Sequence, residues 1–145
     1  MPGTPASGSI VVKSSPSALE GVYQEIRPKL QDNQYVEDDI FAVHLALDEA
    51  FHNAVEHGNK KDSTKTVQID YQIDAQRVEL RIADQGPGFN PGSVPDPRIG
   101  ANLYRPEGRG ILLINAYMDD VKYNETGNQV IMVRYRERPV EKTDT

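Results

Sequence analysis

Residues 47–59 read Leu47-Asp48-Glu49-Ala50-Phe51-His52-Asn53-Ala54-Val55-Glu56-His57-Gly58-Asn59. This stretch ends an apolar run that predicts a helix from about Glu37 to His57, with acidic residues in its first turn and Gly58 just past its end. Glu49 and Asn53 are four residues apart, so a helix places a carboxylate and a carboxamide on one face. A carboxylate can accept a proton and a carboxamide oxygen suits Mg²⁺, but a solvated polar stripe has the same spacing.

The predicted helix is apolar on most of its sides, which predicts that it is nearly buried. Asp48 and Glu49 interrupt this pattern, and a buried carboxylate is costly unless it has a partner or a role. The histidines at positions 44, 52 and 57 fall in or at the end of the same helix, where core or capping roles are expected.

The rest of the chain predicts a sheet backed by helices. Alternating residues predict one hairpin over 67–73 and 78–82 and another over 121–124 and 129–135, and a β-branched run predicts a short strand over 10–13. Ser15 and Pro16 offer the start of a helix that Pro28 should kink or end near Arg27. A further short helix is expected after Gly110. These elements predict one α/β domain over residues 9–136, between tails at 1–8 and 137–145.

Composition excludes several classes of protein. The chain has 145 residues, about one domain, with 37% hydrophobic and 26% charged residues, which argues against a disordered chain. It has neither an apolar run long enough to span a bilayer nor a signal-peptide pattern, so a soluble, cytoplasmic protein without a membrane partner is expected. The absence of cysteine excludes thiolate metal sites, and the net charge of -6 argues against direct nucleic-acid binding.

Two glycine motifs follow the helix. The first, Asp84-Gln85-Gly86-Pro87-Gly88-Phe89, comes directly after a predicted strand. A carboxylate there can accept a hydrogen bond from the exocyclic amino group of adenine, while Gly86 and Gly88 allow a sharp turn and close approach of a ligand; the same pattern is often only a tight turn. The second, Gly108-Arg109-Gly110, opens a helix, where unpaired N–H groups form an anion site. Arg109 could contact phosphate or point to water. Between the motifs lies a Pro/Gly-rich loop of the kind that forms lids.

The order of these motifs resembles the GHKL ATPase superfamily, and most closely the anti-sigma-factor serine/threonine kinases of bacterial partner switching. Residues 47–59 look like that family's N box, and residues 108–114 with 118–121 look like its second glycine box. The resemblance covers about residues 9–136. It implies the following roles: Glu49 as catalytic base, Asn53 as Mg²⁺ ligand, Asp84 as adenine reader, Gly86 and Gly88 as the adenine turn, and Gly108, Arg109 and Gly110 as the phosphate loop.

The resemblance also implies a fold and a function. The fold is a two-layer α/β sandwich of the Bergerat type, with a mixed, mostly antiparallel sheet, helices on one side and an ATP lid over 90–107. The function is an ATP- and Mg²⁺-dependent kinase that phosphorylates an anti-anti-sigma (STAS-type) partner and otherwise binds a sigma factor; a homodimer is favoured. Two alternatives remain: a non-catalytic ATP-binding anti-sigma or adaptor module whose partner binding is set by nucleotide, and the detached catalytic domain of a sensor histidine kinase.

Overall fold

The computed structural model describes residues 5–86, 113–124 and 128–136 of the chain. Its elements, in chain order, are β1 (Ala6–Lys13), the 3₁₀ turn η1 (Pro16–Ala18), α1 (Leu19–Asp32), α2 (Glu37–Asn53), the π-helical turn η2 (Ala54–Gly58), β2 (Thr66–Ile73), β3 (Arg77–Ala83), β4 (Asp120–Tyr123) and β5 (Gln129–Tyr135). Residues 113–117 are also helical.

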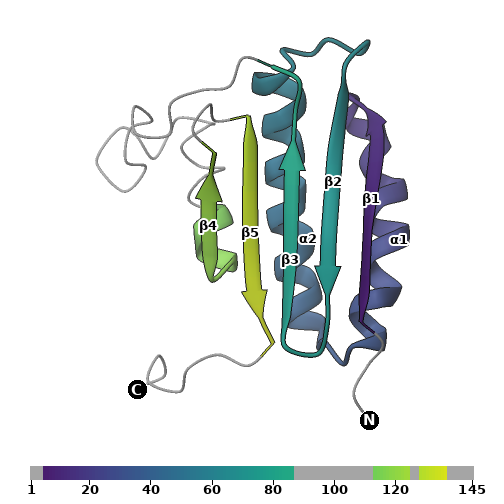
Figure 1. The fold of residues 1–145 in the computed structure, drawn as a ribbon, viewed down its shortest axis with the longest axis vertical. Coiled ribbons are helices and arrows are strands. Elements are labelled where there is room, and N and C mark those ends of the chain that lie inside the picture. The colour runs from purple at the N-terminus through teal and green to yellow at the C-terminus, as the bar shows by residue number, and fades with distance from the viewer. Residues whose placement is uncertain (1–4, 87–112, 125–127, 137–145) are drawn as a thin grey trace.

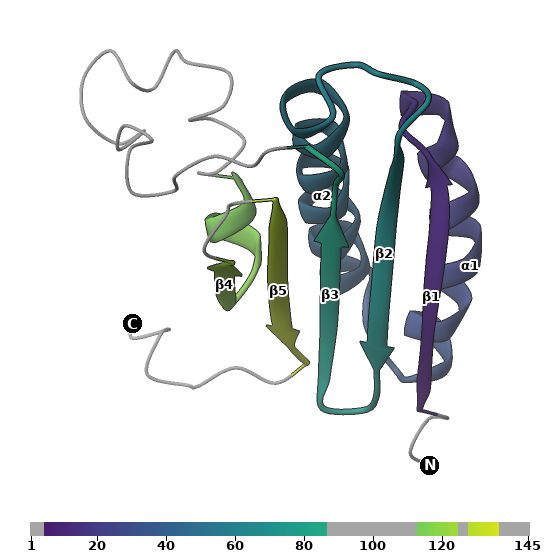
Figure 2. The same cartoon turned by 45° about the horizontal axis from the view of Figure 1, so that its top comes forward.

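The described strands form one sheet in the order β1-β2-β3-β5-β4, and every neighbouring pair is antiparallel. Helices α1 and α2 lie side by side on one face of this sheet, and none of the described helices covers the other face (Figures 1 and 2). The predicted two-layer α/β sandwich with a mostly antiparallel sheet is therefore confirmed. Both predicted hairpins are present, and the helix expected after Gly110 is seen over its described part, 113–117.

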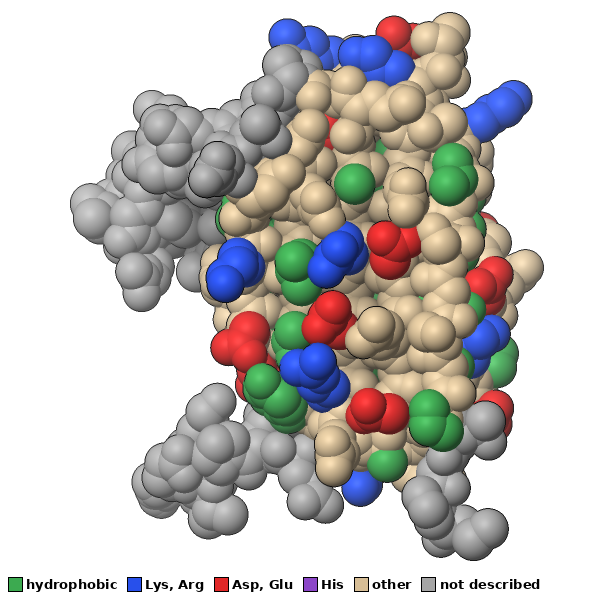
Figure 3. Space-filling view, viewed as in Figure 1, with side chains coloured by type: hydrophobic (Ala, Val, Ile, Leu, Met, Phe, Trp, Pro, Cys, Tyr) green, Lys and Arg blue, Asp and Glu red, His purple; other side chains and the backbone are tan. Residues whose placement is uncertain are grey.

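Alternation along the strands separates the core from the open face of the sheet. In β2 and β3 every second side chain, such as Ile69 and Leu80, is buried against the helices. The side chains between them face the other way, where Figure 3 shows acidic and basic groups interleaved. Asp70 of β2 lies opposite Arg81 of β3, and Glu79 pairs with Arg77 at 3.4 Å. This mixture of signs does not provide the clustered positive charge that nucleic acid requires.

Strand β1 is longer than predicted. It begins at Ala6, which pairs with Ile73 of β2, so residues 6–8 belong to the sheet and the prediction of a tail through residue 8 is wrong. A strand pairs through main-chain groups, which Ser and Gly carry as well as β-branched residues do, and the length of β2 determines how far the pairing runs.

Helix α1 does not end near Arg27 as predicted, because it continues through Pro28 to Asp32. Pro28 is on the exposed side, where the carbonyl that loses its N–H partner can bind water, while the buried side continues from Ile26 to Leu30. Packing of the apolar face therefore outweighs the cost of the proline. Pro16 begins the 3₁₀ turn before α1 as expected, although Ser15 makes no side-chain capping bond.

Helix α2 is amphipathic, so the prediction that it is nearly buried is wrong. One side packs on the sheet, but Phe41 is 59% exposed, and the histidines at 44, 52 and 57 are all exposed. Phe41 and the half-buried Leu45 on the outer side raised the apolar count without lying in the core. The core role expected for the histidines is also wrong. Among the described residues, no helix is long and apolar enough to cross a membrane.

Candidate functional site

Glu49 and Asn53 project from the last turns of α2, and both side chains are partly exposed. Neither makes a hydrogen bond or ion pair with another described residue, so the carboxylate and the carboxamide are available to a ligand. The described residues contain no cluster of three His, Cys, Asp or Glu side chains that would bind a metal alone. Mg²⁺ bound with phosphates needs just one or two protein oxygens, because phosphate and water complete its shell, so Asn53 fits that ion.

Asp84 follows the last residue of β3 and starts a tight turn. Its Oδ1 accepts the Gly86 N–H at 2.8 Å, and its own N–H donates to the Asn128 carbonyl at 2.9 Å. Burial raises the pKa of the Asp84 carboxyl, against the lowering effects of the Gly86 N–H and the Lys65 charge. Oδ2 accepts no hydrogen bond from the described residues, so one oxygen of a carboxylate fixed by the turn remains for a ligand.

The end of α2 meets this turn at two glycines. A Cβ on Gly58 would lie 2.2 Å from Asp84 Oδ2, and a Cβ on Gly86 would lie 1.7 Å from the Gly58 carbonyl oxygen. Gly86 therefore requires glycine for the close approach of two backbone segments, and Gly58 leaves room for the Asp84 carboxylate. The π-helical turn η2 carries the chain from Asn53 to Gly58, so the helix with Glu49 and Asn53 and the turn with Asp84 and Gly86 share one edge of the domain.

The sequence analysis assigned no role in the site to three residues at this junction: Gly58, Asn59 and Asn128. Asn59 is fully buried and accepts the Gln85 N–H at 2.8 Å, and Asn128 Nδ2 donates to the Gly86 carbonyl at 3.3 Å. In the sequence, Gly58 and Asn59 are typical of an ordinary helix end, and Asn128 is typical of a hairpin turn. Their contacts join residues 26 and 42 positions apart, which no local pattern reveals.

Gly88, Gly108, Arg109 and Gly110 lie outside the described residues, as does the predicted lid over 90–107. The next described residues after Gly110 start at position 113, within a helix whose Ile114 is buried in the main core. The described chain thus returns to the core soon after the second glycine motif.

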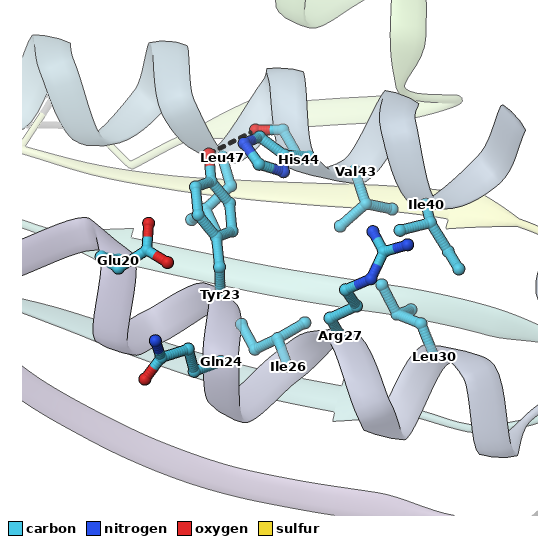
Figure 4. A pocket seen from close by; sticks show the side chains of 10 residues that line it. All are labelled: Glu20, Tyr23, Gln24, Ile26, Arg27, Leu30, Ile40, Val43, His44 and Leu47. Carbon is cyan, nitrogen blue, oxygen red and sulfur yellow. Dashed lines mark hydrogen bonds between the residues drawn. The ribbon is translucent and has the colours of Figure 1, made fainter. Parts of the chain in front are cut away.

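A groove of about 210 Å³ between α1 and α2 is a separate feature (Figure 4). At one end the Tyr23 hydroxyl donates to the His44 carbonyl at 2.8 Å, and the two rings stack with centroids 3.5 Å apart. Of the described residues predicted for the nucleotide site, Glu49, Asn53 and Asp84 do not line this groove.

The Asp84→Asn variant should be more stable than the parent protein at neutral pH. A raised folded-state pKa means that folding disfavours the ionised carboxyl, so stability is greatest below the ordinary value of 3.8 and falls as pH rises through the folded pKa. Asparagine keeps an oxygen for the Gly86 N–H without the charge. Thermal unfolding across this pH range should give similar melting temperatures in acid and a higher one for the variant at neutral pH. A variant less stable than the parent at neutral pH would contradict this account.

Comparison with known proteins identifies a matching family and related proteins. Residues 12–134 match the histidine kinase-like ATPase domain family. The serine-protein kinase RsbW of Bacillus licheniformis is 32% identical over 114 residues, which cover 72% of this chain and 69% of that protein. RsbW of Listeria innocua is 32% identical over 105 residues, covering 67% of each.

A solved structure shares the fold. The RsbU and RsbW domains of Rv1364c from Mycobacterium tuberculosis match with a TM-score of 0.62 at 18% identity, over 92% of this chain and 33% of that chain. This chain thus spans about a third of that solved protein. With the family matched over residues 12–134 and relatives at 32% identity, the chain belongs to the histidine kinase-like ATPase family.

Proposed function

We propose that this chain is an ATP-dependent serine/threonine-protein kinase. The observation that carries the proposal is the junction at Gly58, where the end of the helix bearing Glu49 and Asn53 meets the turn bearing Asp84. Phosphoryl transfer needs positioning, charge stabilisation and a proton acceptor, and this junction places residues of those types at one edge of the domain. The names of the relatives, serine-protein kinase RsbW, support the same activity.

Each residue has a separate task in this proposal. Asp84 accepts a hydrogen bond from the adenine amino group through the oxygen that the turn leaves open, and Gly86 lets the base approach the backbone. Glu49 accepts the proton of the attacking hydroxyl. Asn53 would hold Mg²⁺, which supplies neutralisation of phosphate charge when bound. Gly88 completes the adenine turn, and Gly108, Arg109 and Gly110 bind the phosphates.

The proposed partners follow from the relatives. We infer that the hydroxyl belongs to a serine or threonine of an anti-anti-sigma (STAS-type) protein, and that the chain otherwise binds a sigma factor, as a cytoplasmic homodimer. Two of the relatives are named serine-protein kinase RsbW, and the structural neighbour contains RsbU and RsbW domains. These names support a place for this chain in partner switching.

ATP with Mg²⁺ should stabilise the fold by about 2.7 kcal/mol at roughly a hundredfold excess over its dissociation constant, because it binds the native state alone. GTP should do much less, since guanine presents a carbonyl where adenine has its amino group. Thermal unfolding with each nucleotide measures this, and incubation with labelled ATP and a STAS-type protein measures transfer. Acid-stable phosphoserine or phosphothreonine is expected. Equal stabilisation by both nucleotides would show that Asp84 does not recognise adenine.

The transfer assay also separates the alternatives. Nucleotide binding without any phosphorylated partner would favour a binding module whose shape is set by ATP. Acid-labile phosphate on the chain itself would favour a histidine kinase.

A further inference from the structure

Asn59 is a fully buried polar residue at the start of the loop that follows η2. Its Nδ2 donates to Ser14 Oγ and to the Thr66 carbonyl, each at 3.0 Å, and its Oδ1 accepts the Gln85 N–H at 2.8 Å. One amide group thus joins the end of β1, the start of β2 and the turn after β3. Both the nitrogen and the oxygen of the amide make hydrogen bonds, so burying the Asn59 side chain leaves no polar atom unsatisfied.

The bond to Gln85 falls inside the candidate site. Gln85 lies between Asp84 and Gly86, and its own Oε1 accepts the Thr66 N–H at 2.7 Å. The Asp84 N–H is held by the Asn128 carbonyl of the neighbouring strand segment. The turn is therefore fixed on both sides, and Asn59 supplies the contact from the helix side.

We propose that Asn59 is a positioning residue for the nucleotide site, which sets the orientation of the Asp84 carboxylate by holding the Gln85 N–H. The inference rests on the proposed function, because Asp84 is the adenine reader there. With an exposed fraction of 0%, Asn59 acts through the turn and not by contact with a ligand. An asparagine is required since one planar group must accept one hydrogen bond and donate two; serine is too short and aspartate has no donor.

The test compares Asn59→Ser with Ser14→Ala. Asn59→Ser removes the oxygen that accepts the Gln85 N–H. Ser14→Ala removes one acceptor of the Asn59 amide nitrogen and leaves the hydrogen bond to Gln85 in place. Asn59→Ser should reduce the ratio of ATP to GTP affinity on the order of tenfold, and Ser14→Ala should leave it at the parent value. Amide hydrogen exchange of Gln85 and Gly86, measured without nucleotide and relative to core amides of β3, should speed up in Asn59→Ser alone.

The exchange measurement keeps the inference separate from the proposed function. If the parent binds ATP selectively but both variants match each other in selectivity and in exchange, Asn59 has a general structural role and the inference fails. If neither nucleotide binds the parent, the proposed function fails, and faster exchange of the turn in Asn59→Ser alone still supports the positioning role. Should Asn59→Ser not fold, the parent alone decides: the Gln85 amide, held by the buried Asn59, must exchange about as slowly as core amides of β3, and fast exchange of this amide overturns the inference.

Discussion

Replacing Glu49 with glutamine should slow phosphotransfer on the order of 10² to 10⁴-fold while leaving ATP affinity close to that of the parent. Glutamine keeps the shape of the side chain but cannot accept the hydroxyl proton, and loss of a general base has effects of this size. Glu49 makes no hydrogen bond or ion pair with the described residues, so folding should not depend on it. Single-turnover transfer of labelled phosphate, with ATP binding measured in parallel, gives both quantities.

Two neighbours on α2 provide matched controls. Asp48 carries the same charge one position earlier but is exposed on another side of the helix, so Asp48→Asn should transfer phosphate at the parent rate. Asn53→Ala should weaken binding of the Mg²⁺ complex of ATP more than binding of ATP alone, because the lost oxygen is replaced by untethered water. If Glu49→Gln transfers phosphate at the parent rate, or if Asp48→Asn loses as much transfer rate as Glu49→Gln, Glu49 is not the general base. The better interpretation is then a non-catalytic module whose partner binding is controlled by nucleotide.

Most elements of the fold could be predicted because their signals are local. The hairpin formed by β2 and β3 has strict alternation on both strands, so burial of one face specifies both the strands and their register. The errors arose where tertiary packing outweighed a local rule. The apolar face of α1 carries the helix past Pro28, and pairing with β2 extends β1 to Ala6.

The candidate site could be predicted in part for the same reason. Glu49 and Asn53 share a face by helical spacing, and Asp84 stands at a strand end, so each has a signal within a few residues. Asn59 has no such signal, since its role depends on Ser14, Thr66 and Gln85, which the fold brings together from distant positions. The same holds for the ion pair of Asp39 and Arg134, which are 95 positions apart.

Asp39 and Arg134 form a buried ion pair between the first turn of α2 and β5. The Arg134 Nη2 lies 2.9 Å from Asp39 Oδ1, and the two side chains are 13% and 5% exposed, in that order. The same guanidinium donates to the carbonyl of Tyr117, the last residue of the helix at 113–117. This contact therefore joins the helix that carries Glu49 and Asn53 to the segment that follows the second glycine motif.

Removing one partner should be strongly destabilising. Asp39→Ala should lower the free energy of unfolding by about 3–5 kcal/mol, because it leaves the Arg134 charge buried without compensation. For a chain of this length the melting temperature should fall on the order of 10 °C. Denaturant and thermal unfolding measure both values. The matched control is Asp38→Ala, in the same helical turn but exposed, where a loss of no more than about 1 kcal/mol is expected from the helix dipole.

The double variant Asp39→Leu with Arg134→Met distinguishes an uncompensated charge from lost packing. Apolar residues of similar volume commonly replace a buried pair at little cost, so the double variant should recover most of the stability that Asp39→Ala loses. Recovery should be incomplete, since the Tyr117 carbonyl still lacks the donor that Arg134 provides. If the double variant is no more stable than Asp39→Ala, the loss comes from packing at the start of α2 and not from the isolated charge.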